Sequence, residues 1–319
     1  MSTTAPTPAP APAPVSAFSF KSLALLLDSI KFAHSIFALP FALLAMIVAA
    51  QGLPPARTIV LIVLCMISAR SAAMAFNRFM DRGIDAENPR TRTRPTVTGA
   101  VSLPFMAAFT LISGALFCVF AAQFNRACLV LALPVLAILL GYSLAKRFTS
   151  LCHFWLGLAL GLAPLGAHLA VRGDLSPLAG LGQHWGFTYE YFPILLGVTV
   201  LLWVSGFDLI YACQDYTIDL ADPRLHSMPK QIGIRNALIL SAVLHVLAVA
   251  LLIGCGVYAA MGAWYYGSVV LVAGLLLYEH WIVRPTDLSR VNVAFFTING
   301  CVSLLLFAAV FVERVLLVK

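Results

Sequence analysis

One set of residues suited to chemistry lies near the end of an apolar stretch, where charged side chains are costly. Asn77, Asp81 and Asp85 follow one another at four-residue spacing, and Arg70 stands one heptad before Asn77. At about 100° per residue in a helix, this spacing places all four side chains on one face. Because carboxylates at this spacing repel one another, we expect a cation to lie between Asp81 and Asp85.

A second set follows the same rule further along the chain. Asp208, Tyr211, Asp215 and Asp219 are spaced three, four and four residues apart, and Asp222 lies just beyond them. In a helix these spacings again place the first four side chains on one face. The chain therefore carries two acidic faces, each of which also holds a neutral polar residue.

Two such faces predict a site for a divalent cation and a phosphorylated ligand. Oxygen donors without Cys or His favour Mg²⁺, which typically takes one or two carboxylates and completes its shell with water and phosphate. The expected metal ligands are Asn77, Asp81, Asp85, Asp215 and Asp219. Two facing clusters would clamp a diphosphate, and nearby bases are placed to neutralise its oxygens: Arg78, Arg82, Arg92, Arg94, Lys146 and Arg147. The alternative is that the acids only form salt bridges with these bases at the membrane face.

The elements that must position these residues are membrane-spanning helices. Of the 319 residues, 61% are hydrophobic and only 10% are charged, whereas a soluble domain has about 25% charged residues. This composition excludes a soluble enzyme, a secreted disulfide scaffold and a disordered chain. Because a span needs roughly 20 apolar residues, we predict an all-α, polytopic membrane bundle of about nine helices. The expected spans are 30–51, 57–82, 101–123, 127–145, 150–171, 190–215, 234–256, 261–282 and 291–313.

The distribution of basic residues predicts the orientation of this bundle. With nine spans, fourteen of the 20 Lys and Arg fall on the side that holds the N-terminus and the polar connections 82–99 and 216–233. Five fall on the opposite side, and Arg70 lies within a span. The positive-inside rule therefore places the N-terminus and both connections in the cytoplasm. The net charge of +7 reflects orientation and anionic headgroups, so no nucleic-acid partner is expected.

The N-terminal residues differ from the rest of the chain. Residues 1–16 are dominated by alternating Ala and Pro, a composition typical of an extended, solvated tail. They have no basic start followed by an apolar core, so they do not resemble a signal peptide. We predict a disordered tail over 1–20 and a membrane domain over 21–319.

Four motifs, in this order, resemble those of the UbiA superfamily of intramembrane prenyltransferases. The segment Asn77–Asp85 resembles N-x-x-x-D-x-x-x-D, and Arg90–Gly99 resembles the R-T-x-x-R-P-x-x-x-G that follows it. Tyr142–Arg147 resembles Y-x-x-x-K-R, and Asp208–Asp219 resembles D-x-x-Y-A-x-x-D-x-x-x-D. Arg70, seven residues before the first motif, also matches. The resemblance covers nearly the whole chain after the tail.

The resemblance implies nine helices around a central cavity and an enzyme of quinone biosynthesis, with a bacterial inner membrane as its location. A polyprenyl diphosphate binds through Mg²⁺ to both aspartate motifs, with Lys146 against the diphosphate and the prenyl chain in a groove open to lipid. The acceptor is usually an aromatic ring. The catalytic candidates are Asp81, Asp85, Asp215 and Asp219 with the metal, and Asp208 and Tyr211 a turn or two deeper. Asp208 and Tyr211 either orient the second metal set or approach the reacting carbon.

Two departures from the family's pattern bear on the acceptor. Ile30–Leu43 stands where 4-hydroxybenzoate enzymes begin the first helix with R-x-D-K-P-I-G, and Leu225–Pro229 stands where a basic I-K-S is usual. Both features resemble the branch assigned to menaquinone made through the futalosine route, whose acceptor is a dihydroxynaphthoate. The candidate acceptors are therefore 4-hydroxybenzoate and 1,4-dihydroxy-6-naphthoate.

The carboxylate of such an acceptor needs a cationic or hydrogen-bonding partner. Lys31 and His34 lie three residues apart in the first helix, and Arg70 and His226 are further candidates. The alternative for the first two is that Lys31 reaches the headgroups and His34 packs between helices. His153 and the remaining histidines are expected to pack or lie at the interface.

Two functional alternatives stay open. One is a prenyltransferase with a different acceptor. The other is a membrane transporter, although a transporter places its acids near the midplane rather than at the cytoplasmic ends of its helices. The sequence predicts neither the length of the prenyl chain nor the oligomeric state.

Overall fold

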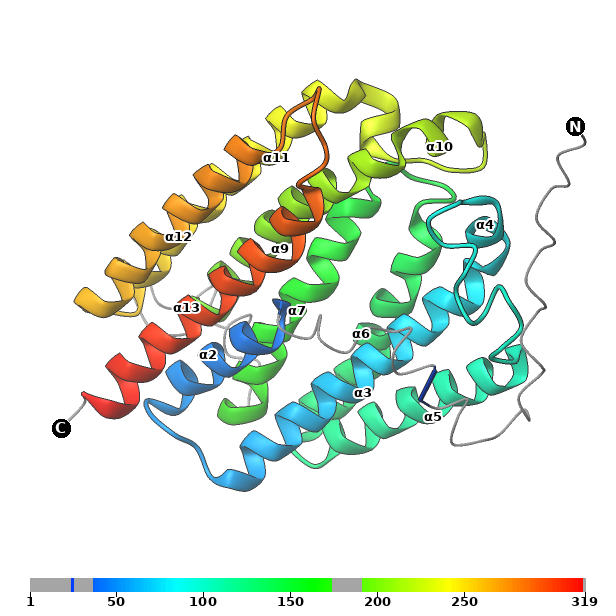
Figure 1. Cartoon of the computed structure of the whole chain (residues 1–319). Coiled ribbons are helices and arrows are strands. Elements are labelled where there is room, and N and C mark those ends of the chain that lie inside the picture. Colours follow the sequence, from blue (N-terminus) through cyan, green and yellow to red (C-terminus); the bar gives the residue numbers. More distant parts are fainter. Residues whose placement is uncertain (1–23, 26–36, 174–190, 318–319) are drawn as a thin grey trace, which may run out of the picture.

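A computed structural model describes residues 24–25, 37–173 and 191–317. The predictions for Lys31, His34 and the N-terminal tail concern residues outside these ranges. The described chain is a bundle of long helices without a β-strand. Figure 1 shows the short helices α4 and α10 at one end of the bundle, with the connection from α2 to α3 at the opposite end. The predicted all-helical architecture is confirmed.

The main helices of the described chain follow the expected apolar runs. They are α2 (Leu39–Ala50), α3 (Ala56–Met80), α5 (Leu103–Ala122), α6 (Arg126–Ala145), α7 (Cys152–Arg172), α9 (Phe192–Ala212), α11 (Met228–Tyr258), α12 (Ala263–Ile282) and α13 (Asn299–Phe311). Seven of the helical segments described are long and apolar enough to cross a membrane. The other two are α12 and α2, and α2 has 12 described residues. The count of nine spans stays a prediction.

The outer surface of the bundle is apolar. Leu111, Leu277 and Val270 expose 73%, 72% and 70% of their surface. A helix that is apolar on all sides belongs in a core or in lipid, and a soluble monomer rarely exposes so much contiguous apolar surface. These side chains therefore form the lipid-facing surface of an integral membrane protein.

Glycines allow α7 and α9 to pack with their backbones nearly in contact. A Cβ at Gly157 would lie 2.4 Å from the carbonyl oxygen of Leu201, and one at Gly161 would lie 2.5 Å from the carbonyl oxygen of Gly197. Small residues four apart permit this approach between membrane helices. The close packing brings His153, one turn before Gly157, against α9.

An aromatic cluster fixes the end of α9. The ring of Tyr211 lies 4.2 Å from the ring of Phe295, centroid to centroid, and Phe295 lies 5.1 Å from Phe207. Phe295 belongs to a π-helical turn, Val293–Ile298, directly before α13. Each such pair contributes about 0.5–1.5 kcal/mol beyond its buried area, so the cluster holds Tyr211 in a defined position.

Candidate active site

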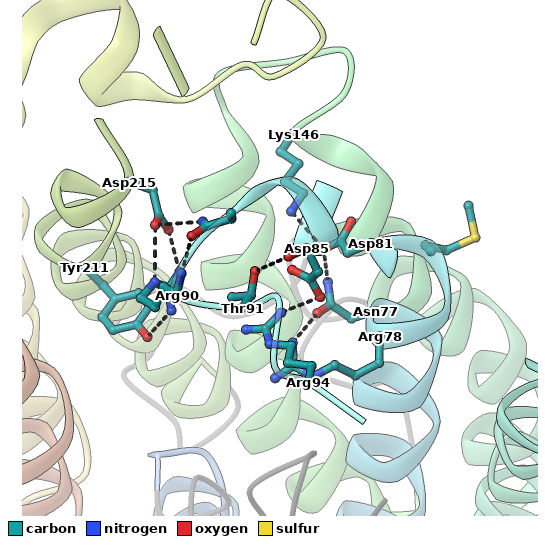
Figure 2. Close-up of polar contacts among 12 residues, drawn as sticks. Asn77, Arg78, Asp81, Asp85, Arg90, Thr91, Arg94, Lys146, Tyr211 and Asp215 are labelled. Atoms are coloured by element: carbon teal, nitrogen blue, oxygen red, sulfur yellow. Dashed lines mark hydrogen bonds and ion pairs between the residues drawn. The ribbon is translucent and has the colours of Figure 1, made fainter. Parts of the chain in front are cut away.

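The first acidic set lies where α3 ends and the six-residue helix α4 (Arg82–Glu87) begins. The amide N–H of Asp81 donates to the Asn77 carbonyl at 2.9 Å, and that of Asp85 donates to the Asp81 carbonyl at 2.8 Å. The i, i+4 bonding therefore continues across the junction, with Asp81 and Asp85 both buried. The structure places Asn77, Asp81 and Asp85 together, as Figure 2 shows.

Cations neutralise both carboxylates of this set. Asp81 Oδ2 accepts from Lys146 Nζ at 2.8 Å and from Asn77 Nδ2 at 3.0 Å. Asp85 Oδ2 accepts from Arg94 Nη1 at 2.6 Å. Lys146 ends α6, while Arg94 belongs to the connection after α4, so three separate segments meet at the first acidic set (Figure 2).

Two further bases lie close to the same set. Arg147 Nη2 donates to the Met80 carbonyl at 2.6 Å and lies 3.4 Å from Asp81 Oδ1. Arg78 Nη1 donates to Asn77 Oδ1 at 3.3 Å. These contacts fit the expectation that Arg78 and Arg147 surround the first acidic set.

Arg82 and Arg92 have other contacts, and their predicted role at the diphosphate stays a prediction. Arg82 Nε donates to the Thr96 carbonyl at 3.0 Å and so holds the connection that follows α4. Among the contacts of the described chain, Arg92 contributes a backbone bond, from its N–H to the Asn88 carbonyl at 2.9 Å. Neither side chain pairs with an acidic-motif carboxylate there, because the turns at 88–98 direct Arg90 and Arg94 to the acids instead.

Arg90 connects the first motif to the second. Its Nη2 lies 2.6 Å from Asp215 Oδ2, its Nε lies 3.3 Å from Asp215 Oδ1, and its Nη1 donates to the Tyr211 hydroxyl at 3.1 Å. Asn88 Nδ2 also donates to Asp215 Oδ1 at 3.3 Å. Burial lowers the pKa of Arg90, but Asp215 and Tyr211 outweigh burial and raise it above the ordinary value. The connection after the first motif is therefore held to the second motif through the Arg90 guanidinium (Figure 2).

The other two aspartates of the second motif have different partners. The helix tightens into a 3-10 turn at Cys213–Asp215 before α10 (Tyr216–Ala221). Asp219 Oδ2 accepts from Ser227 Oγ at 2.6 Å, while Asp208 Oδ2 lies 2.7 Å from Nδ1 of His153 on α7. The second acidic face therefore has three separate sets of partners: one at Asp208, one at Tyr211 and Asp215, and one at Asp219. The change in helical pitch at the 3-10 turn rotates these side chains relative to one another.

An exposed ion pair joins the two connections at the surface. Arg224 Nη2 lies 2.7 Å from Glu87 Oε2 and 2.7 Å from Asp222 Oδ2. Hydrogen bonds from Arg224 lower the pKa of Asp222 to about 2, so its carboxylate is charged at neutral pH. Exposed pairs of this kind stabilise proteins only weakly.

An apolar cavity of about 570 Å³ lies within the bundle. It is lined mainly by α3, α6 and α7, and its few polar lining residues include Arg70 and Tyr142. Tyr142 is also within electrostatic reach of Asp81 and Asp208. The wall of the cavity therefore comes within reach of the acidic residues at Tyr142.

Of the acceptor candidates in the described chain, Arg70 lies in the wall of this cavity. His226 lies in the connection before α11 and contacts the end of α6, where its N–H donates to the Lys146 carbonyl at 2.7 Å. The Nδ1 of His226 is buried and has no hydrogen-bond partner among the described residues. Both positions are close to one of the acidic sets or to the cavity.

Sequence reasoning left three site residues without a role. Arg90 and Asn88 contact Asp215, and His153 contacts Asp208. Arg90 opens the R-T-x-x-R-P motif, so its position in that motif was a usable signal. His153 carried no sequence signal, because only the close packing of α7 on α9 brings it to Asp208.

The oxygen donors fit Mg²⁺ chemically. The described chain contains no group of three or more Asp, Glu, His or Cys close enough together to hold a metal ion. Each acidic set instead offers a pair of carboxylates, and Mg²⁺ typically takes one or two carboxylates together with water and substrate phosphate. The donor set therefore suits a metal ion that arrives with a diphosphate.

A helical membrane bundle with two acidic segments and an apolar cavity suits an intramembrane enzyme that acts on an amphipathic substrate. The model of the UbiA prenyltransferase family matches residues 38–301. The chain belongs to this family, and it is a prenyltransferase and an integral membrane protein.

Curated relatives support this assignment over most of the chain. The 4-hydroxybenzoate octaprenyltransferase of Aromatoleum aromaticum is 31% identical over 282 residues, which are 85% of this chain and 86% of the relative. The enzyme of the same name from Nitrosomonas eutropha is 29% identical over 278 residues, or 84% of this chain and 88% of the relative.

Solved structures share the fold. The apo structure of a UbiA homologue from Aeropyrum pernix K1 has a TM-score of 0.77 and 33% identity, covering 88% of this chain and 98% of the homologue. A UbiA homologue from Archaeoglobus fulgidus, bound to DMAPP and Mg²⁺, has a TM-score of 0.69 at 21% identity and covers 92% of this chain and 99% of the homologue. The resemblance predicted from the four motifs is confirmed.

Proposed function

We propose that this prenyltransferase transfers a polyprenyl group from a polyprenyl diphosphate to a small aromatic acid in a Mg²⁺-dependent step of quinone biosynthesis. The observation that carries the proposal is that cations pair with Asp81 and with Asp215 in a bundle that also contains an apolar cavity. A diphosphate suits the charged end, and a prenyl chain suits the apolar cavity.

The residues that hold the metal in this proposal are Asn77, Asp81, Asp85, Asp215 and Asp219. When bound, Mg²⁺ neutralises charge on the diphosphate as it departs. Lys146, Arg94 and Arg90 now pair with the aspartates, and they turn to the phosphate oxygens once substrate arrives. Charge-assisted bonds from such bases are strongest in a water-poor site.

The cavity is where the allylic carbon reacts with the acceptor in this proposal. Departure of the diphosphate leaves positive charge on the allylic carbon, which water would quench. The apolar walls around Arg70 and Tyr142 exclude water from that carbon. The electron-rich ring of the acceptor then attacks it.

The acceptor is 4-hydroxybenzoate or 1,4-dihydroxy-6-naphthoate, and Arg70 binds its carboxylate. Two relatives are named 4-hydroxybenzoate octaprenyltransferase, which supports the first acceptor. The Leu225–Pro229 segment supports the second, since it departs from the pattern usual in that family. In either case the excess of basic residues supports a cytoplasmic location for the acidic end of the bundle.

The direct test offers both acceptors to the same enzyme. Purified protein in lipid nanodiscs is incubated with Mg²⁺, a polyprenyl diphosphate and each acid separately, and products are identified by mass spectrometry. We expect a prenylated acid from one of the two acceptors, and none after EDTA removes the metal. Absence of product from both acids would contradict the proposed function.

A further inference from the structure

His153 is a buried histidine that connects three helices at the candidate site. Its Nδ1 lies 2.7 Å from Asp208 Oδ2 on α9, and its Nε2 lies 3.3 Å from the backbone N of Met228 at the start of α11. The side chain of His153 is 4% exposed and that of Asp208 is 13% exposed. Asp208 precedes Tyr211 on α9 by about one turn and precedes Asp215, in the 3-10 turn after α9, by about two.

The two contacts define which ring nitrogen carries the proton. A backbone N–H only donates, so Nε2 of His153 must accept from Met228. Nδ1 then carries the hydrogen and donates it to the Asp208 carboxylate. The same bond satisfies an N–H in the first turn of α11, where intrahelical acceptors are lacking.

Asp208 keeps one oxygen available. Oδ2 is used by His153, whereas Oδ1 accepts no hydrogen bond from any residue the structure describes. Tyr142, which lines the cavity, is within electrostatic reach of Asp208. Asp208 is therefore near one residue of the cavity wall.

We infer that His153 is a positioning residue that orients Asp208 to remove the ring proton of the aromatic acceptor. The inference rests on the proposed function. The prenyl C–O bond breaks with its electron pair on the diphosphate, and a ring carbon of the acceptor bonds to the prenyl carbon. The C–H bond of that ring carbon then breaks, its electrons restore the aromatic ring, and the proton passes to Asp208 Oδ1. Water takes the proton from Asp208 when the products leave.

The packing of α7 on α9 supports this role over simple filling of space. Gly157 and Gly161 allow the helices to approach closely, and Ser205 Oγ, which donates to the Leu201 carbonyl at 2.7 Å, lies 3.3 Å from the His153 carbonyl oxygen. The backbone and the ring of His153 are both fixed, which leaves the Asp208 carboxylate little freedom. A base held in this way is prepared before the acceptor binds.

Two substitutions separate the two contacts of His153. In His153→Asn the side-chain amide can donate at the position of Nδ1, so the bond to Asp208 is retained and the bond from Met228 is lost. In His153→Gln the amide oxygen can accept from Met228 at the position of Nε2, and the donor to Asp208 is lost. Asp208→Asn removes the base itself and serves as the reference.

We expect His153→Gln to lower kcat by about 10²-fold, which is the cost of misplacing a reacting group by about 1 Å. The KM for the prenyl diphosphate should not change. His153→Asn should keep most of the turnover. With a ring-deuterated acceptor, wild type should show an isotope effect near unity, and His153→Gln should show a clear normal effect because proton removal becomes slow.

The double variant tests whether His153 acts through Asp208. We expect His153→Gln with Asp208→Asn to be no slower than Asp208→Asn alone, because residues that act as a unit are not additive. Additive losses, equal losses in the Asn and Gln variants, or a lack of isotope effect in His153→Gln would overturn the inference. The proposed function is tested separately by the turnover of wild type. The tests of His153 compare the turnover rates of variants with one another, all measured with the same acceptor.

Discussion

The contact between α7 and α9 gives the sharpest test of how the fold builds the site. In Gly157→Ala, the new Cβ would lie 2.4 Å from both the Leu201 carbonyl oxygen and Ser205 Oγ. Neither contact is tolerable, and one of them is backbone, so the helices must separate. Overpacking of this kind costs about 1–3 kcal/mol. The same separation stretches the 2.7 Å bond between His153 and Asp208.

A control lies on another helix of the bundle, α11. A Cβ at Gly254 would meet nothing within 4 Å, and Gly254 does not line the cavity, so Gly254→Ala gains helix propensity, about 0.5–1 kcal/mol, without a clash. The difference between the two variants therefore isolates the steric cost. We expect thermal unfolding in nanodiscs to place Gly157→Ala below Gly254→Ala, with turnover reduced only in Gly157→Ala. Equal stability and activity in the two variants would refute the argument from close packing.

Three further outcomes follow from the contacts at the site. In Arg90→Gln, Asp215 loses its guanidinium partner, so the substrate-free enzyme should bind Mn²⁺ more tightly, as measured by electron paramagnetic resonance. The affinity for the prenyl diphosphate should fall. Unchanged Mn²⁺ affinity would argue against a shared site. Arg70→Leu should raise the acceptor KM roughly tenfold or more, as loss of a charged hydrogen bond predicts, and leave the donor KM unchanged; the reverse pattern would move the acceptor elsewhere. Arg224→Ala should leave turnover unchanged. The pKa of Asp222 is lowered from its ordinary value of 3.8 to about 2. The stabilisation from the Asp222–Arg224 pair is therefore complete above pH 3.8 and is lost only as the pH falls toward 2. Any difference in unfolding temperature between Arg224→Ala and wild type should thus be the same in mildly acidic and mildly basic buffers.

The elements of this fold were predictable because the bilayer imposes strong constraints on them. Apolar runs about 20 residues long predict membrane helices wherever they occur, and the structure follows them from α3 to α13. The four-residue spacing of Asn77, Asp81 and Asp85 also survived, because hydrogen bonding continues through the α3–α4 junction. Local spacing therefore predicted the first acidic set well.

Contacts between distant segments were harder to predict. The 3-10 turn at Cys213–Asp215 divides the second acidic face, and no simple periodicity in the sequence marks it. The approach of His153 to Asp208 depends on glycines whose partners lie on another helix. Residue type and charge do not distinguish Arg82 and Arg92 from Arg90 and Arg94. The turns at 88–98 decide which of these side chains reach a carboxylate. These contacts depend on tertiary packing, which residue spacing along the sequence does not predict.

The central claim is that the two acidic sets act together on one metal-bound diphosphate. The most direct measurement compares the rate of prenylated product formation in Asp81→Asn and Asp215→Asn with that of wild type, at saturating Mg²⁺. Glu87→Gln provides the control, because Glu87 is an exposed acid of α4 that pairs with Arg224. We predict a loss of at least about 10²-fold in each aspartate variant and near wild-type turnover in Glu87→Gln. Full Mg²⁺-dependent turnover in either aspartate variant would contradict the claim.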